Sequence, residues 1–425
     1  MRSPAGRLPD ADDLVRRLPR PGICAAVYGG SILILLLSHL GDGWGFVDLT
    51  IYRYGGQAAL RGAHLYALRF PGALAFTYPP FAALLFTALT VPSMAVLRPL
   101  LTAGDLLLLP AMLGFALRLA PVSGWLSRGQ ALRVALLAAA VAIWLEPVWT
   151  TLRYSQIDVL IGALVLYDLS RPDGSRWKGA AIGLAIGLKL TPVIFALYLL
   201  LSRRYRAAAV SAVAFCGTIA TAFVLLPGDS REYWGGAFID PGRVGRIENA
   251  ANQSLRGALA RLVHSMDVQT AWLCAAVAVG LAGMAMAVAA ARRGDEARGF
   301  ALCALTGLLV SPVSWSHHWT LAVPALLVFA LGAYRRGSIV ALSGAAAAAA
   351  LAFSHVIWWV PVNRPLHSEL HLGALQLLYA DAYVLAGLCA LAAAGAGWLM
   401  ARRTARPRAA PGLLLRRAPG SEGVP

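Results

Sequence analysis

The sequence predicts an all-α fold, a polytopic bundle of about 10 to 12 transmembrane segments, some of them broken or re-entrant. The 425 residues are 59% hydrophobic and only 13% charged, whereas soluble domains are about 25% charged. Apolar runs long enough to cross a bilayer core of about 30 Å recur along the chain. These two observations exclude an ordinary water-soluble fold.

The net charge of +17 is the third observation, because the basic residues stand in the turns beside the apolar runs. This distribution is typical of cytoplasmic loops; it predicts orientation and gives no reason to expect a nucleic-acid partner. Residues 1–20 are then a cytoplasmic N-terminus, 21–401 the transmembrane domain and 402–425 a disordered cytoplasmic tail. Stretches 41–77 and 227–267 are predicted to be external loops.

The clearest spans run over 24–40, 132–150, 206–226, 268–291, 338–360 and 376–401. Segments 79–94 and 99–118 cannot both span if the preceding loop is outside and Arg128 is inside; partial penetration of the shorter one is one explanation. The run 179–201 has basic residues at both ends and Pro192 in its middle. Because proline interrupts the helical hydrogen-bond ladder, we expect two half-helices that enter and return.

Polar residues that interrupt apolar runs are candidates for function, because ionisable groups in a bilayer are costly. Asp48 lies among apolar residues just beyond the first span. A carboxyl in such surroundings has a raised pKa and suits a general base that takes a proton from a sugar hydroxyl. A helix cap or an ion-pair partner for Arg53 is an equal alternative.

Three further candidates follow in the next spans. Arg153 offers a guanidinium for a phosphate and Gln156 an amide for a sugar hydroxyl, with an interfacial anchor beside a satisfied Asp158 as the alternative. Lys189 stands alone at the expected helix break. A buried ammonium needs an anionic partner, and because its own run offers no acid we expect a ligand phosphate, with snorkelling to the interface as the alternative.

Two later segments complete the candidate site. Asn252, Gln253 and Arg256 could bind sugar hydroxyls or phosphate, or form the N-cap of a short amphipathic helix. In segment 311–319, a proline break sets paired histidines beside tryptophans, which suits sugar stacking and phosphate binding, although an interfacial aromatic belt has the same composition. Because adjacent residues on a helix point in different directions, we expect no two-histidine metal site.

Taken in order, these segments resemble glycosyltransferase family 87, the actinobacterial polyprenyl-phosphate-mannose-dependent α-1,2-mannosyltransferases. The resemblance extends from about residue 44 to 320. It rests on Asp48 with Tyr52 and Gly55, Leu65-Tyr66, Tyr78-Pro79-Pro80-Phe81, Ser155-Gln156, Lys189-Leu190-Thr191-Pro192, Asn252-Gln253-Ser254-Leu255 and Ser311-Pro312-Val313-Ser314-Trp315-Ser316-His317-His318.

The resemblance implies a C-type glycosyltransferase fold with Asp48 as the general base. The donor would be polyprenyl phosphate mannose with a β-linked sugar, and an α product implies inversion in one displacement. No cofactor is implied, and we expect chemistry without a metal. The groups expected to bind the donor phosphate or sugar are His317, His318, Lys189, Arg256, Arg153, Gln156, Asn252, Gln253, Tyr52, Tyr78 and Trp315.

The chain departs from the family pattern at two places. The family has Gly before the residue that matches Gln156 and Asn or a small polar residue after it, where this chain has Ser155 and Asp158. An acid commonly precedes the paired histidines, where this chain has Ser316. These differences leave the reaction class unchanged and leave the acceptor and the donor sugar open.

We therefore expect a multi-pass plasma-membrane mannosyltransferase whose partners are the lipid-linked donor, a glycolipid or lipoglycan acceptor and membrane lipids, with its active site on the extracytoplasmic side. A lipid-linked sugar flippase would use the same broken helices, with Asp48 in binding or proton coupling. A non-catalytic scaffold would leave the buried Lys189 unexplained. Formation of a glycosidic bond separates the first two alternatives.

Overall fold

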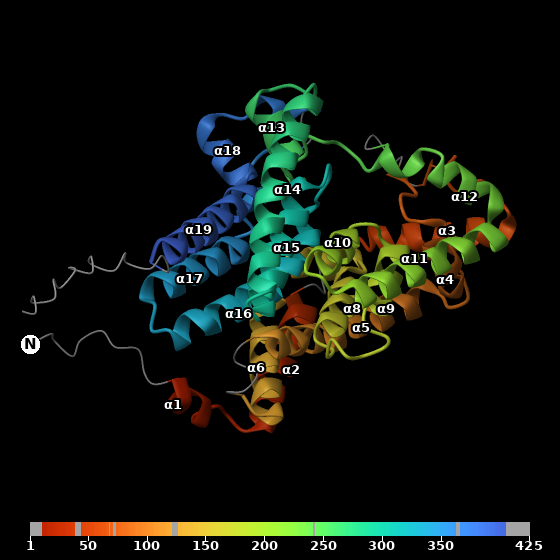
Figure 1. Ribbon diagram of the computed structural model, residues 1–425. Coiled ribbons are helices and arrows are strands. Elements are labelled where there is room, and N and C mark those ends of the chain that lie inside the picture. Colours follow the sequence, from red (N-terminus) through yellow and green to blue (C-terminus); the bar gives the residue numbers. More distant parts are fainter. Residues whose placement is uncertain are drawn as a thin grey trace, which may run out of the picture.

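The computed structural model describes residues 11–38, 44–67, 69–70, 74–120, 126–240, 243–362 and 366–404. This part of the chain is a helical bundle with a single small hairpin, so the predicted all-α membrane fold is confirmed (Figure 1). The predicted tail from residue 405 onward and the predicted N-terminus through residue 10 lie outside the described residues.

The first half of the chain supplies most of the helices around the candidate site. Their bounds are α1 Ala11–Arg16, α2 Pro21–Ser38, α3 Val47–Arg61, α4 Pro80–Phe86, the 3-10 helix η2 Thr87–Thr90, α5 Met94–Leu119, α6 Arg128–Ala142, α7 Glu146–Tyr154, α8 Asp158–Leu169, α9 Ala180–Leu188 and α10 Val193–Leu201. Strands β1 Arg69–Phe70 and β2 Leu74–Ala75 pair antiparallel, with Arg69 opposite Ala75.

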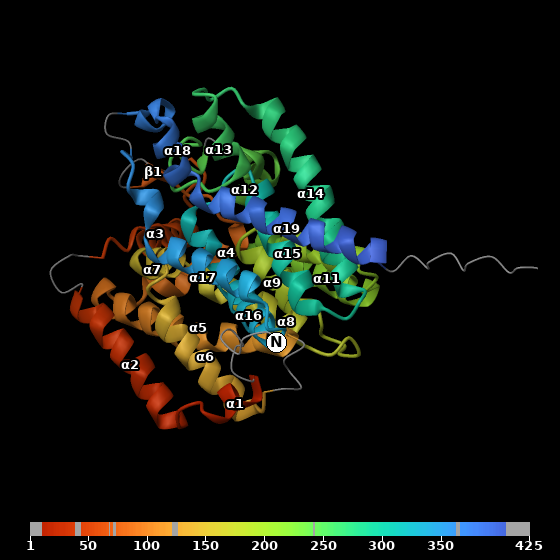
Figure 2. The same cartoon turned by 90° about the vertical axis from the view of Figure 1, so that its left-hand side faces the viewer.

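The second half contains longer helices and the segments that join them. Their bounds are α11 Tyr205–Leu225, α12 Pro227–Trp234, η4 Ala237–Ile239, α13 Leu255–Leu262, α14 Gln269–Ala291, α15 Glu296–Val310, η6 Ser316–Leu321, α16 Ala322–Arg335, α17 Ile339–Phe353, η7 Val356–Trp358, η8 Ser368–His371, α18 Ala374–Ala380 and α19 Ala382–Thr404. Helices α13 and α18 lie toward one end of the molecule and α1 toward the opposite end (Figure 2).

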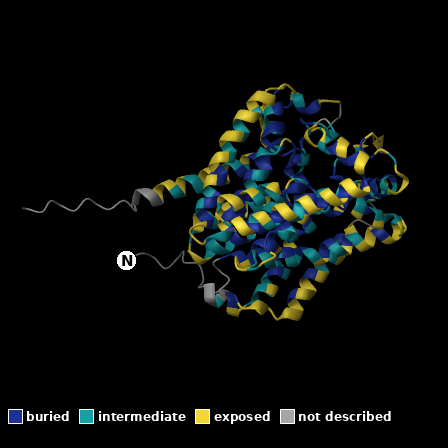
Figure 3. Ribbon diagram, turned by 45° about the vertical axis from the view of Figure 1, so that its right-hand side comes forward, coloured by how far each residue is buried: buried dark blue, intermediate teal, exposed yellow. Residues whose placement is uncertain are grey.

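Seven described helices are long and apolar enough to cross a membrane, and the bent pair α6 and α7 would make an eighth span. Their outward faces are apolar, as contact with lipid requires: Val340 is 86% exposed, Val224 78% and Leu281 70%. Figure 3 shows exposed residues running along the outer helices of the bundle. The other predicted segments are shorter helices inside the bundle or beside it.

The stretch 41–77, which was predicted to be an external loop, contains helix α3 and the β1–β2 pair. Helix α3 packs directly on α4 at Gly56, where a side-chain carbon would come within 2.3 Å of the Phe86 carbonyl oxygen. The conflict over segments 79–94 and 99–118 is also resolved. The first is only α4 with η2, and the second is the long helix α5, so one of the two spans.

Span 132–150 was predicted to be a single helix, and the structure divides it. Helix α6 ends at Ala142, and α7 begins at Glu146 with its axis turned by 77°. Pro147 stands in the first turn of α7, where its missing N–H leaves no unsatisfied donor. The bend directs the end of α7 toward the N-terminus of α3, where the Phe46 N–H donates to the Arg153 carbonyl at 3.1 Å.

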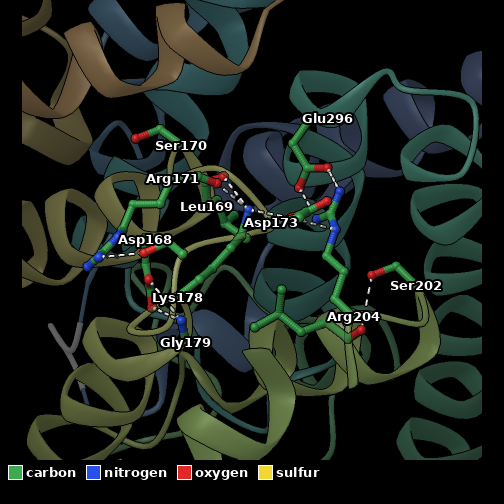
Figure 4. A network of polar contacts seen from close by, with 12 residues as sticks. Asp168, Leu169, Ser170, Arg171, Asp173, Lys178, Gly179, Ser202, Arg204 and Glu296 are labelled. Carbon is green, nitrogen blue, oxygen red and sulfur yellow. Dashed lines mark hydrogen bonds and ion pairs between the residues drawn. The ribbon is translucent and has the colours of Figure 1, made fainter. Parts of the chain in front are cut away.

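The break expected in 179–201 lies at Lys189, which has an extended backbone between α9 and α10. Each half-helix has nine residues and is about 14 Å long, less than half the thickness of a bilayer core. The two outer ends meet at one residue: Asp173 pairs with Lys178 before α9 at 2.8 Å and with Arg204 after α10 at 3.5 Å (Figure 4). The segment therefore enters and returns.

Two further contacts fix this end of the pair. The Asp168 carboxylate accepts hydrogen bonds from the backbone N–H groups of Gly179 and Ile182, which caps α9 at its positive end. Arg204 binds both carboxylate oxygens of Glu296 at the start of α15 (Figure 4). The start of α9 and the end of α10 are thus held together at one end of the pair. The break at Lys189 lies at the other end, at a fixed distance from these contacts.

We expect cysteines at Gly174 and Tyr205, which flank the two half-helices, to be labelled by a membrane-impermeant maleimide from the same side. Both positions are exposed. The measurement uses a chain whose native Cys24, Cys216, Cys274, Cys303 and Cys389 are replaced by alanine. A cysteine at Phe238, which is 42% exposed beyond α11, is the control and should be labelled from the opposite side. Labelling of positions 174 and 205 from opposite sides would contradict the re-entrant path.

Candidate active site

Asp48 lies in the first turn of α3, with its carboxylate partly buried. Its side chain is hydrogen-bonded to Gln156, which comes from the turn between α7 and α8. Arg53 points elsewhere, and its guanidinium donates to the carbonyls of Leu89 and Thr90 in η2, each at 3.1 Å. The alternative in which Asp48 is the partner of Arg53 is therefore wrong.

Gln156 is the centre of a buried polar cluster beside Asp48. Its Oε1 accepts from the hydroxyls of Tyr52 at 2.8 Å and Tyr78 at 3.1 Å, and the two hydroxyls lie 2.9 Å from each other. Because Oε1 serves the tyrosines, the Gln156 amide nitrogen is left to donate to the Asp48 carboxylate. Three segments that are far apart in the sequence thus meet at the carboxyl.

Lys189 does have an acidic partner in the protein. The sequence had predicted a ligand phosphate as its partner, because the apolar run around Lys189 contains no acid. Its Nζ lies 2.7 Å from Oδ1 of Asp158, and both side chains are at least nine-tenths buried. The acid was missed because it comes from the start of α8, 31 residues earlier. The ammonium also lies 5.9 Å from the centre of the Tyr78 ring, which places it beside the Gln156 cluster.

His317 and His318 lie in the 3-10 helix η6, and both are buried. Their ring centres are 4.9 Å apart, and one nitrogen of each lies with an Asp158 oxygen in a group whose atoms are all within 4.8 Å of one another. The expectation that the two rings diverge is therefore wrong, because it assumed an α-helix. Within the described residues, His317 Nε2 and Asp158 Oδ2 have no hydrogen-bond partner.

The Lys189 ammonium is the feature of this cluster that favours an anion over a dication. The Lys189 ammonium already occupies one oxygen of Asp158 and places a fixed positive charge next to the imidazoles. A like charge at this distance opposes binding of a metal cation, whereas a phosphate gains from the ammonium and from imidazole N–H donors. The expectation of metal-independent chemistry stays a prediction.

Asp48 has the protonation behaviour of a base that works near neutral pH. Burial raises the pKa of its carboxyl from 3.8 to about 7, while the Lys189 ammonium and the Gln156 hydrogen bond hold this pKa below the value that burial alone would give. A general base is most effective when its pKa lies near the working pH. A partly exposed carboxyl with such a pKa can therefore take a proton from a hydroxyl group bound next to it.

Asn252 and Gln253, predicted to bind the donor, are fully buried, and their amides are engaged by the protein itself. Asn252 Oδ1 accepts from the Ser314 N–H at 2.9 Å and its Nδ2 donates to the Ile247 carbonyl at 2.9 Å. Gln253 binds the carbonyl of Ala380 and the N–H of Tyr383. These residues position the segment that precedes the histidines, so we remove both from the ligand-binding set.

Three other predicted residues make their side-chain contacts outside the buried cluster. Arg256 packs its guanidinium 5.3 Å from the Trp272 ring centre, beyond the Ser254 N-cap of α13. Trp315 forms a bridge with Asn252 and covers Gly245. Arg153 is exposed and lies over the Trp149 ring. The structure thus brings together Asp48, Tyr52, Tyr78, Gln156, Lys189, His317 and His318.

Sequence reasoning missed Glu146, which organises the wall behind the histidines. This fully buried carboxylate accepts from Thr150 and Ser316 at 2.7 Å each, from Trp358 Nε1 at 3.0 Å and from the Tyr383 hydroxyl at 2.9 Å. The signal that could have found it was a charged residue inside an apolar run, which is the signal that drew attention to Lys189. Ser316, which stands where the family pattern has an acid, is thereby joined to an acid from another helix.

The fold is that of a multi-pass membrane protein, in which a titratable carboxyl lies beside a buried cluster of polar side chains. The sequence profile of glycosyltransferase family 87 matches residues 76–312. With this match and the relatives below, the chain belongs to glycosyltransferase family 87. The protein is therefore a glycosyltransferase, and the family supports neither the flippase nor the scaffold alternative. Asp48 lies well before the matched residues, and the paired histidines lie shortly after them.

Two relatives are both polyprenol-phosphate-mannose-dependent alpha-(1-2)-phosphatidylinositol mannoside mannosyltransferases. The Mycobacterium tuberculosis protein is 35% identical over 82% of this chain and 84% of its own. The Mycolicibacterium smegmatis protein is 36% identical over 80% and 81%. A M. tuberculosis pentamannoside mannosyltransferase with the same donor dependence is 35% identical over 67% of this chain and 66% of its own. No solved structure is a significant match.

For a reaction in which Asp48 is the general base, the rate of glycosyl transfer should rise with pH through a midpoint of about 7, because only the deprotonated carboxyl accepts a proton. Below the midpoint, kcat/KM should fall about tenfold per pH unit. Gln156→Leu should move the midpoint upward, since it removes a hydrogen bond that favours the charged form. The pH profile of each protein checks this, and an unchanged midpoint in the variant would contradict the coupling between the two residues.

Proposed function

We propose that this enzyme transfers mannose from polyprenyl phosphate mannose to a hydroxyl group of a glycolipid or lipoglycan, with Asp48 as the general base. The observation that carries the proposal is the position of the Asp48 carboxyl, with a pKa of about 7, beside the buried Lys189, His317 and His318. The donor and the acceptor class follow the activities named for the relatives.

The reaction is one displacement at the anomeric carbon of the donor. The acceptor oxygen forms the new bond to this carbon while the bond from the carbon to the phosphate oxygen breaks. Asp48 takes the acceptor hydroxyl proton, and the bonding electron pair leaves with polyprenyl phosphate. Attack from the face opposite the phosphate converts a β-linked donor into an α product, in line with the α linkage that the relatives make.

In this proposal, the ammonium of Lys189 and the imidazole of His317 stabilise the phosphate that leaves. Negative charge grows on the phosphate oxygens in the transition state, so fixed donors aimed at them lower the barrier. Lys189 supplies a permanent charge beside Asp158, and His317 has a ring nitrogen without a protein partner among the described residues. Tyr52 and Tyr78 hold Gln156, which keeps the base oriented between the phosphate and the acceptor.

The site is proposed to face the extracytoplasmic side of the plasma membrane. Arg292 and Arg293 lie between α14 and α15, with Arg298 in the first turn of α15, and such clusters mark cytoplasmic turns. Helix α14 leads from this turn to α13 at the opposite end of the molecule. Asp48 in α3 and Gln156 after α7 come after one and three crossings from the N-terminus, counting α6 with α7 as a single crossing. This count supports a position on the far side for both.

Asp48→Asn should lower mannosyl transfer by a factor of about 10² to 10⁴, the usual contribution of a general base. The measurement incubates membranes with radiolabelled polyprenyl phosphate mannose and a mixed glycolipid extract at equal expression, and follows label into product. Asp267→Asn, which changes an exposed external carboxyl, is the matched control and should transfer normally. Equal transfer by wild type and Asp48→Asn would remove Asp48 from the mechanism.

Chelation by EDTA should leave the transfer rate of the purified enzyme unchanged, because Lys189 supplies the positive charge that a metal would otherwise provide. Metal analysis of the dialysed protein gives an independent readout. If EDTA abolishes transfer and a divalent cation restores it in wild type, then Asp158, His317 and His318 hold an ion, and the phosphate assignment of the histidines is wrong.

A further inference from the structure

A cavity of about 380 Å³ lies between the end of α7 and η7, outside the buried cluster. Its lining includes Trp149, Arg153 and Tyr154 from α7, with His355, Trp358 and Trp359 from the end of α17 and η7. This volume is within the usual range for small-molecule sites. None of the functions assigned above uses this cavity.

The cavity adjoins the proposed active site through two contacts. The Phe46 N–H, two residues before Asp48, donates to the carbonyl of Arg153 at 3.1 Å. The Tyr154 ring centre lies 6.0 Å from that of His317, so Tyr154 has the cavity on one side and the buried cluster on the other. A molecule in the cavity would therefore lie next to the catalytic centre.

The lining has the chemistry of a site for a charged sugar headgroup. Indole faces stack on the apolar faces of sugar rings, and Trp359 is 62% exposed here. Arg153 is exposed, and no carboxylate among the described residues forms an ion pair with it. Its guanidinium lies 5.1 Å from the centre of the Trp149 ring, which orients the cation while leaving its N–H donors available for a phosphate.

We propose that this cavity binds the acceptor, a glycolipid whose sugar headgroup is joined to its lipid by a phosphodiester, with Arg153 on the phosphodiester and the indole rings of Trp149 and Trp359 against the sugars. The proposal rests on the function proposed above. It assigns Arg153 to the acceptor, whereas the sequence had suggested the donor.

Charge and burial distinguish the acceptor from the donor. The donor carries one phosphate, and the buried cluster of Lys189 and the histidines already provides for it. Arg153 is a second cationic group in a separate, more open space, so it calls for a second anionic substrate. An interfacial aromatic belt would explain tryptophans at this depth. It does not explain a guanidinium held among them at the edge of the active site with no ion-pair partner among the described residues.

The test measures binding without turnover, on the purified full chain in nanodiscs. The probes are radiolabelled phosphatidylinositol mannoside, a mannosyl diacylglycerol that lacks the phosphodiester, and polyprenyl phosphate mannose. The variants are Arg153→Gln and Trp359→Ala, with Trp359→Phe to retain an aromatic ring. Arg118→Gln is the matched control, because Arg118 is also exposed and lies over an aromatic ring, that of Phe115, in α5.

Arg153→Gln should raise the Kd for phosphatidylinositol mannoside about tenfold, as expected for loss of one charge-assisted hydrogen bond. It should leave the affinity for the mannosyl diacylglycerol and for the donor unchanged. Trp359→Ala should weaken both mannolipids, and Trp359→Phe and Arg118→Gln should resemble wild type.

Wild-type affinity of Arg153→Gln and Trp359→Ala for the acceptor probe would overturn the proposal. Weaker binding of polyprenyl phosphate mannose alone would overturn it as well, because the cavity would then belong to the donor. A wild-type protein that binds phosphatidylinositol mannoside in this way but transfers no mannose would refute the proposed function and leave the binding site standing.

Discussion

The buried ion pair between Lys189 and Asp158 sets the position of the site. It joins the break between α9 and α10 to the first turn of α8, where the positive end of the helix favours the carboxylate. Loss of either partner would leave an uncompensated charge inside the bundle, which typically costs about 3 to 5 kcal/mol. Because the half-helices are anchored at their base by Asp173, the pair holds the ammonium at one depth relative to Asp48.

The short turn between α7 and α8 connects this ion pair to Asp48. Asp158 faces Lys189, and Gln156, two residues earlier, faces Asp48. Ser155 makes the turn possible in a left-handed conformation, with φ of 57°. Glycine adopts that conformation without steric cost, which is a physical reason for the glycine of the family pattern at this position. Serine here retains the turn at a cost of about 1 kcal/mol.

The C-terminal third of the chain contributes to the site although the family profile ends at residue 312. Glu146 links α7 to η6 through Ser316, to η7 through Trp358 and to α19 through Tyr383. The histidines and the Trp358 side of the cavity are therefore positioned by the same carboxylate. A change in the last helices would reach the proposed donor and acceptor regions through this shared contact.

The sequence by itself determined the membrane fold, the helix break at Lys189 and the set of polar segments that meet near Asp48. These follow from local physics: apolar runs of bilayer length, a proline in a helix, and the cost of burying a charge. Tertiary structure decided which groups pair. Lys189 pairs with an acid on another helix, and the buried side chains of Asn252 and Gln253 bind backbone groups. The geometry of η6 made the two imidazoles converge, and the packing of α7 near η7 formed the cavity beside Arg153. Such contacts join residues far apart in the chain, and local patterns do not specify the distances between them.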